Sequence, residues 1–159
     1  ESPMKLFYAS LLALMLSPLQ SFGAAAKCEL AVQSGIDANG KPNPMAFNVK
    51  SIEVPASCKK FKITLENKST LPKTAMGHNL VVSEAGKMAA VTAAALKAGI
   101  KNEYLQKGSG EITATKLLGP SEKDSVTLVV ANLKKGSAYK FFCTFPGHSA
   151  MMQGDLSVK

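Results

Sequence analysis

Downstream of residue 26, apolar and polar residues alternate in several short segments, as in half-buried β-strands. The alternation is clearest in Phe61–Glu66 and Phe47–Ile52. Shorter apolar runs predict further strands at Leu80–Val82, Val126–Val130, Tyr139–Phe142 and Leu156–Val158. Clusters of Gly, Pro, Asn and Ser separate these segments, so the chain is predicted to fold mainly from short β-strands.

Two segments depart from this pattern. Lys87–Ala98 is rich in alanine and is followed by Gly99, which predicts a helix of about three turns that ends at this glycine. Asp37–Pro44 contains two prolines and a glycine, and is predicted to be a loop without regular structure. Short antiparallel strands with one inserted short α-helix predict an all-β fold, a Greek-key β-sandwich.

The first 26 residues have the features of a secretory signal peptide. Met4 and Lys5 precede an apolar run, Leu6–Leu16, which is too short to cross a bilayer comfortably, and the small residues Gly23–Ala26 follow. We predict cleavage after Ala26, with residues 1–3 as a cloning remnant or a misplaced start, and a mature domain over residues 27–159. A lipid anchor on Cys28 is disfavoured, because the preceding residue is lysine rather than a small residue.

The net charge of the chain does not by itself identify a class of binding partner. The formal charge is +8, and all 19 basic residues are lysines. Residues 1–26 contain one lysine and one glutamate, so their removal leaves this charge unchanged. The lysines are scattered and no arginine can make bidentate contacts, so nucleic-acid binding is not predicted. A basic surface can still steer an acidic protein partner.

The C-terminal segment 143–152 and the segment 76–79 contain a candidate metal site. Cys143 is followed by His148 and Met152 in a Cys-x4-His-x3-Met pattern, and His78 is the only other histidine. A thiolate, two imidazoles and a distant thioether make up a blue-copper site, which suits both Cu(I) and Cu(II). We therefore predict one copper ion in a trigonal plane formed by His78, Cys143 and His148.

The axial position has two candidates that are adjacent in sequence. We predict Met152 as the distant ligand and expect the side chain of Met151 to face solvent. The carbonyl oxygen of Gly77 is placed to approach the copper from the other side. The competing interpretation, a buried free cysteine with incidental histidines and core methionines, does not account for the spacing.

Three cysteines in an exported protein suggest one disulfide and one free thiol. If Cys143 serves the metal, Cys28 and Cys58 form the disulfide. The alternative is that Cys143 is in the disulfide and another cysteine is free.

Several motifs give the chain a close resemblance to the azurins, the bacterial blue-copper proteins of the cupredoxin fold. They include Leu71–Lys73, Met76–Asn79, Glu103–Leu105, Glu122–Val126 and Phe141–Ala150, and the likeness extends over essentially the whole mature chain. The resemblance implies copper ligands at His78, Cys143, His148 and Met152, with a weak contact to Gly77. It also implies a Cys28–Cys58 disulfide and an asparagine, Asn79, that bridges the two ligand segments.

The resemblance also implies a periplasmic monomer that carries electrons between transient redox partners such as c-type cytochromes or copper-containing reductases, without membrane insertion of the mature domain. An apolar patch around the edge of His148 would dock these partners. Its predicted residues are Met45, Leu71, Ala75, Met76, Leu96, Phe145, Pro146, Ala150 and Met151. The Asp37–Pro44 loop looks longer than is usual in the family and would lie at the same end.

Other functions fit the residues less well. A copper oxidase or nitrite reductase needs further histidines, but the two histidines of this chain are already assigned to the predicted site. A cysteine hydrolase needs a third group that orients the base, and none is evident. The main alternative is a periplasmic copper-buffering protein, and zinc also accepts such ligands.

Overall fold

The structure is a computed structural model, and it describes residues 26–159. The predicted signal peptide therefore lies outside the described residues, apart from Ala26. Within the described part of the chain, no helix is long and apolar enough to cross a membrane.

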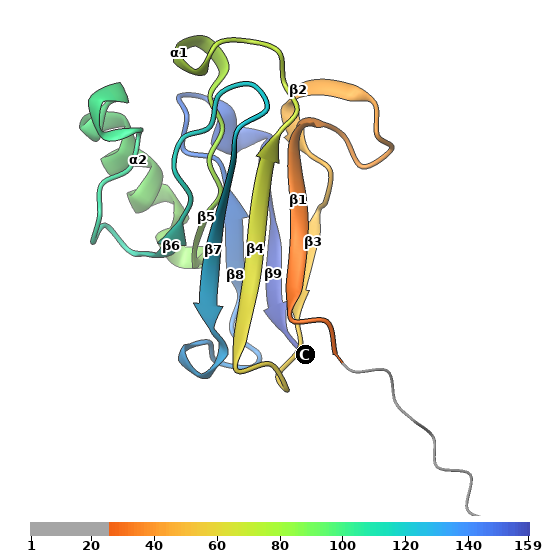
Figure 1. Cartoon of the computed structure of the whole chain (residues 1–159). Coiled ribbons are helices and arrows are strands. Elements are labelled where there is room, and N and C mark those ends of the chain that lie inside the picture. Colours follow the sequence, from red (N-terminus) through yellow and green to blue (C-terminus); the bar gives the residue numbers. More distant parts are fainter. Residues whose placement is uncertain (1–25) are drawn as a thin grey trace, which may run out of the picture.

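Two β-sheets pack face to face (Figure 1). The first sheet has the strand order β2-β1-β4-β7, formed by Pro42–Phe47, Glu29–Ile36, Lys60–Asn67 and Lys123–Val129. The second has the order β3-β9-β8-β5-β6, formed by Ser51–Val54, Gln153–Val158, Tyr139–Phe142, Val81–Glu84 and Glu111–Ala114. The predicted β-sandwich is thus confirmed, although the strands located in the sequence did not include β1 or β6.

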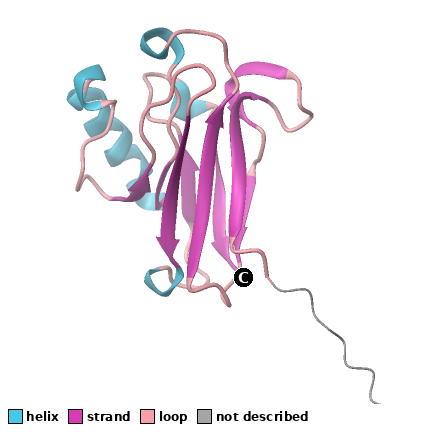
Figure 2. Cartoon of the chain, in the orientation of Figure 1, coloured by secondary structure: helices cyan, strands magenta, loops and turns pink. Residues whose placement is uncertain are grey.

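The inserted helix also agrees with its prediction. α2 comprises Met88–Ala98 and lies outside the sandwich (Figure 2). Gly99 ends it with a φ of 67°, and its N–H donates to the carbonyl of Ala95. A single helical turn, α1 (Lys73–Met76), was not predicted. Short 3-10 helices occur at η1 (Ala85–Lys87), η2 (Ile100–Asn102), η3 (Val130–Asn132) and η4 (His148–Ala150).

The prediction of one strand over Phe47–Ile52 is wrong. β2 ends at Phe47, and β3 begins at Ser51 in the other sheet. Asn48 lies at the crossing, where its N–H donates to the carbonyl of Gln33 and its side-chain oxygen accepts from the Gln33 N–H. Alternation of apolar residues continued through this crossing, so the sequence pattern did not reveal it.

The Asp37–Pro44 segment is also more regular than predicted. A turn at Asp37–Gly40 leads into β2, which contains both prolines. β2 is an edge strand, so one side of it needs no ladder hydrogen bonds and proline is tolerated. The structure thus shortens the predicted loop and places Pro44 within the sheet.

The expectation of antiparallel strands is only partly correct. β1 runs parallel to β4 over Glu29–Ser34, and β3 runs parallel to β9 over its whole length. The remaining pairs are antiparallel. Parallel partners need long connections, and these connections take the chain from one sheet to the other.

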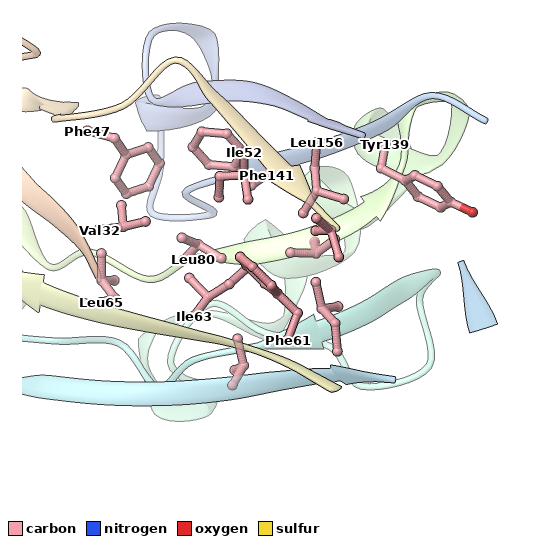
Figure 3. Close-up of a cluster of buried hydrophobic side chains, with 14 of the residues drawn as sticks. Val32, Phe47, Ile52, Phe61, Ile63, Leu65, Leu80, Tyr139, Phe141 and Leu156 are labelled. Atoms are coloured by element: carbon pink, nitrogen blue, oxygen red, sulfur yellow. The ribbon is translucent and has the colours of Figure 1, made fainter. Parts of the chain in front are cut away.

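The core lies between the two sheets (Figure 3). In β4, Phe61, Ile63 and Leu65 point inward, as the period-two pattern predicted. The rings of Phe47 and Phe141 meet with centroids 5.7 Å apart. Each fully buried side chain of this size stabilises the fold by about 1.5–3 kcal/mol. Cys143 and Met152 belong to the same buried cluster, so the candidate site is an extension of the core.

A disulfide joins Cys28 and Cys58, 30 residues apart, which confirms the predicted pairing. It lies where β1 begins and β4 approaches, at the lower end of the sandwich in Figure 1. Cys143 is the free cysteine of the described chain and is fully buried.

Candidate metal centre

The structure brings together the three side chains that the sequence singled out. One ligand atom from each of His78, Cys143 and His148 lies within 4.8 Å of the other two. The Sγ of Cys143 is 3.6 Å from Nδ1 of His148, and the two imidazole centroids are 5.1 Å apart. All three residues are buried.

The segment from Cys143 to Met152 folds back on itself through backbone hydrogen bonds. After β8, the turn at Gly147 takes a φ of 81°, which favours glycine. The N–H of His148 donates to Phe145, and the carbonyl of His148 accepts from Met152 at 2.7 Å. The N–H of Cys143 donates to the carbonyl of Met152 at 3.0 Å. These bonds bring residues five and nine positions after Cys143 back beside it.

His78 comes from the segment before β5. It lies outside the strands and forms an isolated antiparallel bridge with Leu118. The two residues exchange backbone hydrogen bonds of 3.1 and 2.7 Å. This pairing fixes the backbone on which the His78 imidazole is mounted.

Gly77 is required by close packing. A Cβ at this position would lie 2.6 Å from the carbonyl oxygen of Lys73 and 2.9 Å from Cγ of Leu117. Only glycine lets the backbone next to His78 approach α1 this closely.

Asn79 joins the two ligand segments, as predicted for a bridging residue. Its Nδ2 donates to Oγ1 of Thr144 at 2.7 Å, and its Oδ1 accepts from the N–H of Thr144 at 2.8 Å. The hydroxyl of Thr144 in turn donates to the carbonyl of Tyr104 at 2.6 Å. Asn79 and Thr144 are both fully buried.

Thr144 and Tyr104 were missed as supporting residues. Tyr104 and its neighbour Glu103 both have positive φ, at 50° and 55°. Residues other than glycine rarely adopt this conformation, so the segment is held by its surroundings. The ring of Tyr104 also packs edge-on against Phe145, with centroids 5.2 Å apart. Sequence motifs do not encode the contact between Thr144 and Tyr104, which are 40 residues apart.

Burial shifts the ionisation of the three side chains toward their neutral forms. It raises the pKa of the Cys143 thiol to about 11, although the backbone N–H groups of Asn79 and Phe145 act in the opposite direction. Burial, and then the proximity of His148, lowers the pKa of His78 to about 4, while the Pro44 carbonyl raises it slightly. Burial also lowers the pKa of His148. Both imidazoles are therefore neutral at pH 7 and can act as ligands.

The donor set fits a metal ion. Both ring nitrogens of His78 are buried and make no well-formed hydrogen bond among the described residues, although the Pro44 carbonyl is close enough to raise the His78 pKa. An unsatisfied buried polar group costs about 1–3 kcal/mol, and a metal bond would satisfy one of these atoms. One soft sulfur and two imidazole nitrogens match copper, and zinc accepts the same atoms. The residues present therefore fit the ion that the sequence predicted.

Met151 and Met152 differ sharply in exposure. Met152 is fully buried beside the cluster, whereas 59% of Met151 is exposed. Only Met152 is therefore buried, in the core cluster that also contains Cys143.

The residues predicted for the docking patch do not all reach the surface. Leu71, Leu96 and Met151 are exposed large side chains. Ala75, Pro146 and Ala150 are also exposed, and Met76 is half-buried. Phe145 is only 8% exposed, and Met45 packs against the core. Phe145 therefore offers little surface to a partner, whereas Met45 is half-buried, like Met76.

Comparison with known proteins places these features in context. The family model of copper-binding proteins of the plastocyanin/azurin family matches residues 34–159. An azurin from Pseudomonas aeruginosa strain PAO1 is 43% identical over 156 residues, which are 98% of each chain. An azurin from Bordetella pertussis is 44% identical over 130 residues, 81% of this chain and 86% of the relative. A solved structure of the azurin Az-iso2 from Methylomonas sp. strain J aligns with a TM-score of 0.75 at 38% identity, and the match covers 84% of this chain and 99% of that one.

Proposed function

The chain belongs to the plastocyanin/azurin family of copper-binding proteins, and we propose that it holds its copper ion with His78, Cys143, His148 and Met152. The protein is a blue-copper electron-transfer protein with one copper ion, and its fold is the cupredoxin Greek-key β-sandwich. In this proposal the Gly77 carbonyl would make a weak contact with the ion.

One observation carries the ligand assignment: the thiol and two imidazoles converge in a buried site, where no described residue makes a well-formed hydrogen bond with the His78 nitrogens. When bound, copper supplies one-electron chemistry by cycling between Cu(I) and Cu(II). The backbone segments that carry the donor side chains are hydrogen-bonded to other parts of the fold, which holds the donors in place. Their burial excludes water from the site. Asn79 keeps the His78 segment at a fixed distance from the Cys143 segment through its two bonds to Thr144.

We propose that electrons enter and leave at His148. His78 is fully buried, whereas His148 is 3% exposed and lies two and three residues before the exposed Ala150 and Met151. Apolar side chains around this edge would exclude water at a transient contact. In this proposal the contact is short-lived and the protein is a monomer.

The partners proposed for this surface are c-type cytochromes or copper-containing reductases. We also propose that the mature chain comprises residues 27–159 and works in the periplasm after export. The apolar sequence Leu6–Leu16 and the small residues before Lys27 support export, and the Cys28–Cys58 disulfide supports an oxidising compartment. Electron carriage, rather than catalysis or copper buffering, is the proposed role.

A copper titration of the exported protein tests the ligand assignment. Cu(II) should produce an intense visible band from the thiolate-to-copper transition, and ascorbate should remove it. Cys143→Ser should abolish the band, Met152→Ala should alter it, and Met151→Ala should leave it unchanged. A colourless protein, or equal effects of the two methionine changes, would contradict the assignment. The metal content of protein purified from the periplasm separates copper from zinc.

Electron self-exchange tests the proposed docking face. Met151→Lys should slow self-exchange, measured by NMR line broadening in mixtures of the oxidised and reduced protein, because it places a charge in the contact. Val129→Lys is a matched control, since Val129 is 45% exposed but lies at the other end of the sandwich. Equal rates in both variants would exclude this face. Fast exchange with a cytochrome would distinguish a carrier from a buffer.

A further inference from the structure

The end of the sandwich away from the metal centre contains an open recess of about 590 Å³. It lies where β4 begins and where β7 and β9 end, at the bottom of Figure 1. β4 extends from Lys60 beside the recess to Asn67, whose Nδ2 donates to the carbonyl of Leu118, the partner of His78. An eight-residue strand spans about 25 Å, which separates the recess from the metal centre.

The floor of the recess is apolar. Cys58, Val130, Leu133 and Val158 line it and are each less than 9% exposed. Val129 lines it as well and is 45% exposed, so an apolar wall faces solvent. Covering this wall with an apolar group would remove it from water, which is favourable in proportion to the area covered.

The rim of the recess is basic. Lys59, Lys60 and Lys135 line it together with the apolar residues, and all three are exposed. None of the three takes part in the salt bridges found among residues 26–159. The described residues that line the recess include no aspartate or glutamate. The ammonium groups of these three lysines are therefore available to an anion from outside the chain.

We propose that this recess binds a single-chain anionic amphiphile, such as a fatty acid. The alkyl chain would lie against Val129 of the wall and against Val130 and Val158 of the floor, and the carboxylate would meet the ammonium groups at the rim. The volume lies within the roughly 300–1,000 Å³ that is usual for small-molecule sites. Lysine reaches such a head group with its charge while its alkyl stem covers apolar surface.

The concave shape favours a free single-chain ligand over a flat bilayer. A free chain can enter the recess directly, whereas a lipid in a bilayer would first have to leave the membrane plane. The proposal is independent of the electron-transfer role, since the recess and the copper site are at opposite ends. A bound amphiphile would occupy the disulfide end and leave the His148 face free for redox partners.

Titration with decanoate below its micelle concentration, followed by NMR of the copper-free and the copper-loaded exported protein, tests the proposal. Shifts should appear at Val129, Val130 and Val158, and binding should weaken as salt concentration rises. In Lys59→Gln/Lys60→Gln/Lys135→Gln, the Kd should rise by about tenfold or more, because the cationic rim is gone. Circular dichroism and the copper band verify that the variant is folded.

A matched triple variant removes three other exposed lysines, Lys97, Lys101 and Lys107, and should bind decanoate like the parent protein. Decyltrimethylammonium, with the same chain length and the opposite charge, should not bind. Equal affinity for both amphiphiles, an unchanged Kd in the rim variant, or shifts confined to the His148 face would overturn the proposal. Binding to phosphatidylglycerol vesicles without binding of free decanoate would also overturn it, since the lysines would then recognise a membrane surface.

Discussion

The bridge from Asn79 to Thr144 should be worth several kcal/mol to the metal-free protein. Asn79→Leu keeps the branched shape of the side chain but removes both bonds to Thr144, one of which satisfies the buried Thr144 N–H. A net hydrogen bond contributes about 1 kcal/mol, and an orphaned buried N–H costs about 1–3 kcal/mol. Asn79→Leu should therefore lower the free energy of unfolding by about 3 kcal/mol.

Thr144→Val tests the same bridge from the other side. It removes the hydroxyl that accepts from Asn79 and donates to Tyr104, at an expected cost of about 2 kcal/mol. The two variants share one bond, so the double variant should lose about 1 kcal/mol less than the sum of the single losses. Asn102→Leu is the control, because Asn102 makes an exposed side-chain bond to Ala98 and should change stability by less than about 0.5 kcal/mol.

Guanidinium denaturation of the four chelator-treated proteins measures this cycle, and release of copper to a chelator provides a functional readout. Copper should leave Asn79→Leu faster than the parent, because the two ligand segments are no longer joined. Strict additivity of the two single changes, or a loss in Asn79→Leu no larger than in Asn102→Leu, would refute the idea that this bridge holds the site together.

Four further predictions concern the backbone of the site, its ionisable side chains and the disulfide. Gly77→Ala should cost about 1–3 kcal/mol and weaken copper binding, since its Cβ would be 2.6 Å from a carbonyl oxygen; Gly86→Ala, with open space around it, should be neutral in the same denaturation assay. In metal-free protein, stability should fall by about 3 kcal/mol as pH drops from about 6.5 to 4, because the unfolded chain protonates His78 first; a flat urea profile over this range would contradict it. Stability should also fall from about pH 9 to 11, because the Cys143 thiol ionises first in the unfolded chain. Replacing Cys28 and Cys58 by serine should cost about 3–4 kcal/mol and leave the visible copper band unchanged.

The features predicted correctly are those encoded by local chemistry. The Cys-x4-His-x3-Met spacing places ligands within one loop, so its geometry depends on few distant contacts. The alanine run and Gly99 mark α2 to within one residue of its observed start, because helix propensity and the C-cap are local. The strand Tyr139–Phe142 was likewise placed correctly, since it is bounded by a turn and by the metal loop.

The errors arise where distant partners decide the structure. Alternation from Phe47 to Ile52 fits one strand, but strand pairing sends its two ends to different sheets. Pro42 and Pro44 were predicted to lie in a loop, but they lie in the edge strand β2. One side of an edge strand makes no ladder hydrogen bonds, so a missing N–H is tolerated there. The parallel pairing of β1 with β4 also depends on register, and a period of two does not encode register.

The same distinction explains why the ligands could be named from the sequence while their support could not. Ligand identity depends on the chemistry of side chains, but the position of His78 depends on backbone bonds to the remote Leu118. These bonds exist without the metal, so the fold itself holds an unpaired imidazole and a protonated, buried thiol close together. That arrangement is unfavourable until a metal satisfies it, which means that copper should stabilise the fold while changing its geometry little. A site fixed in this way presents the same frame to both oxidation states, and that constancy is what an electron carrier requires.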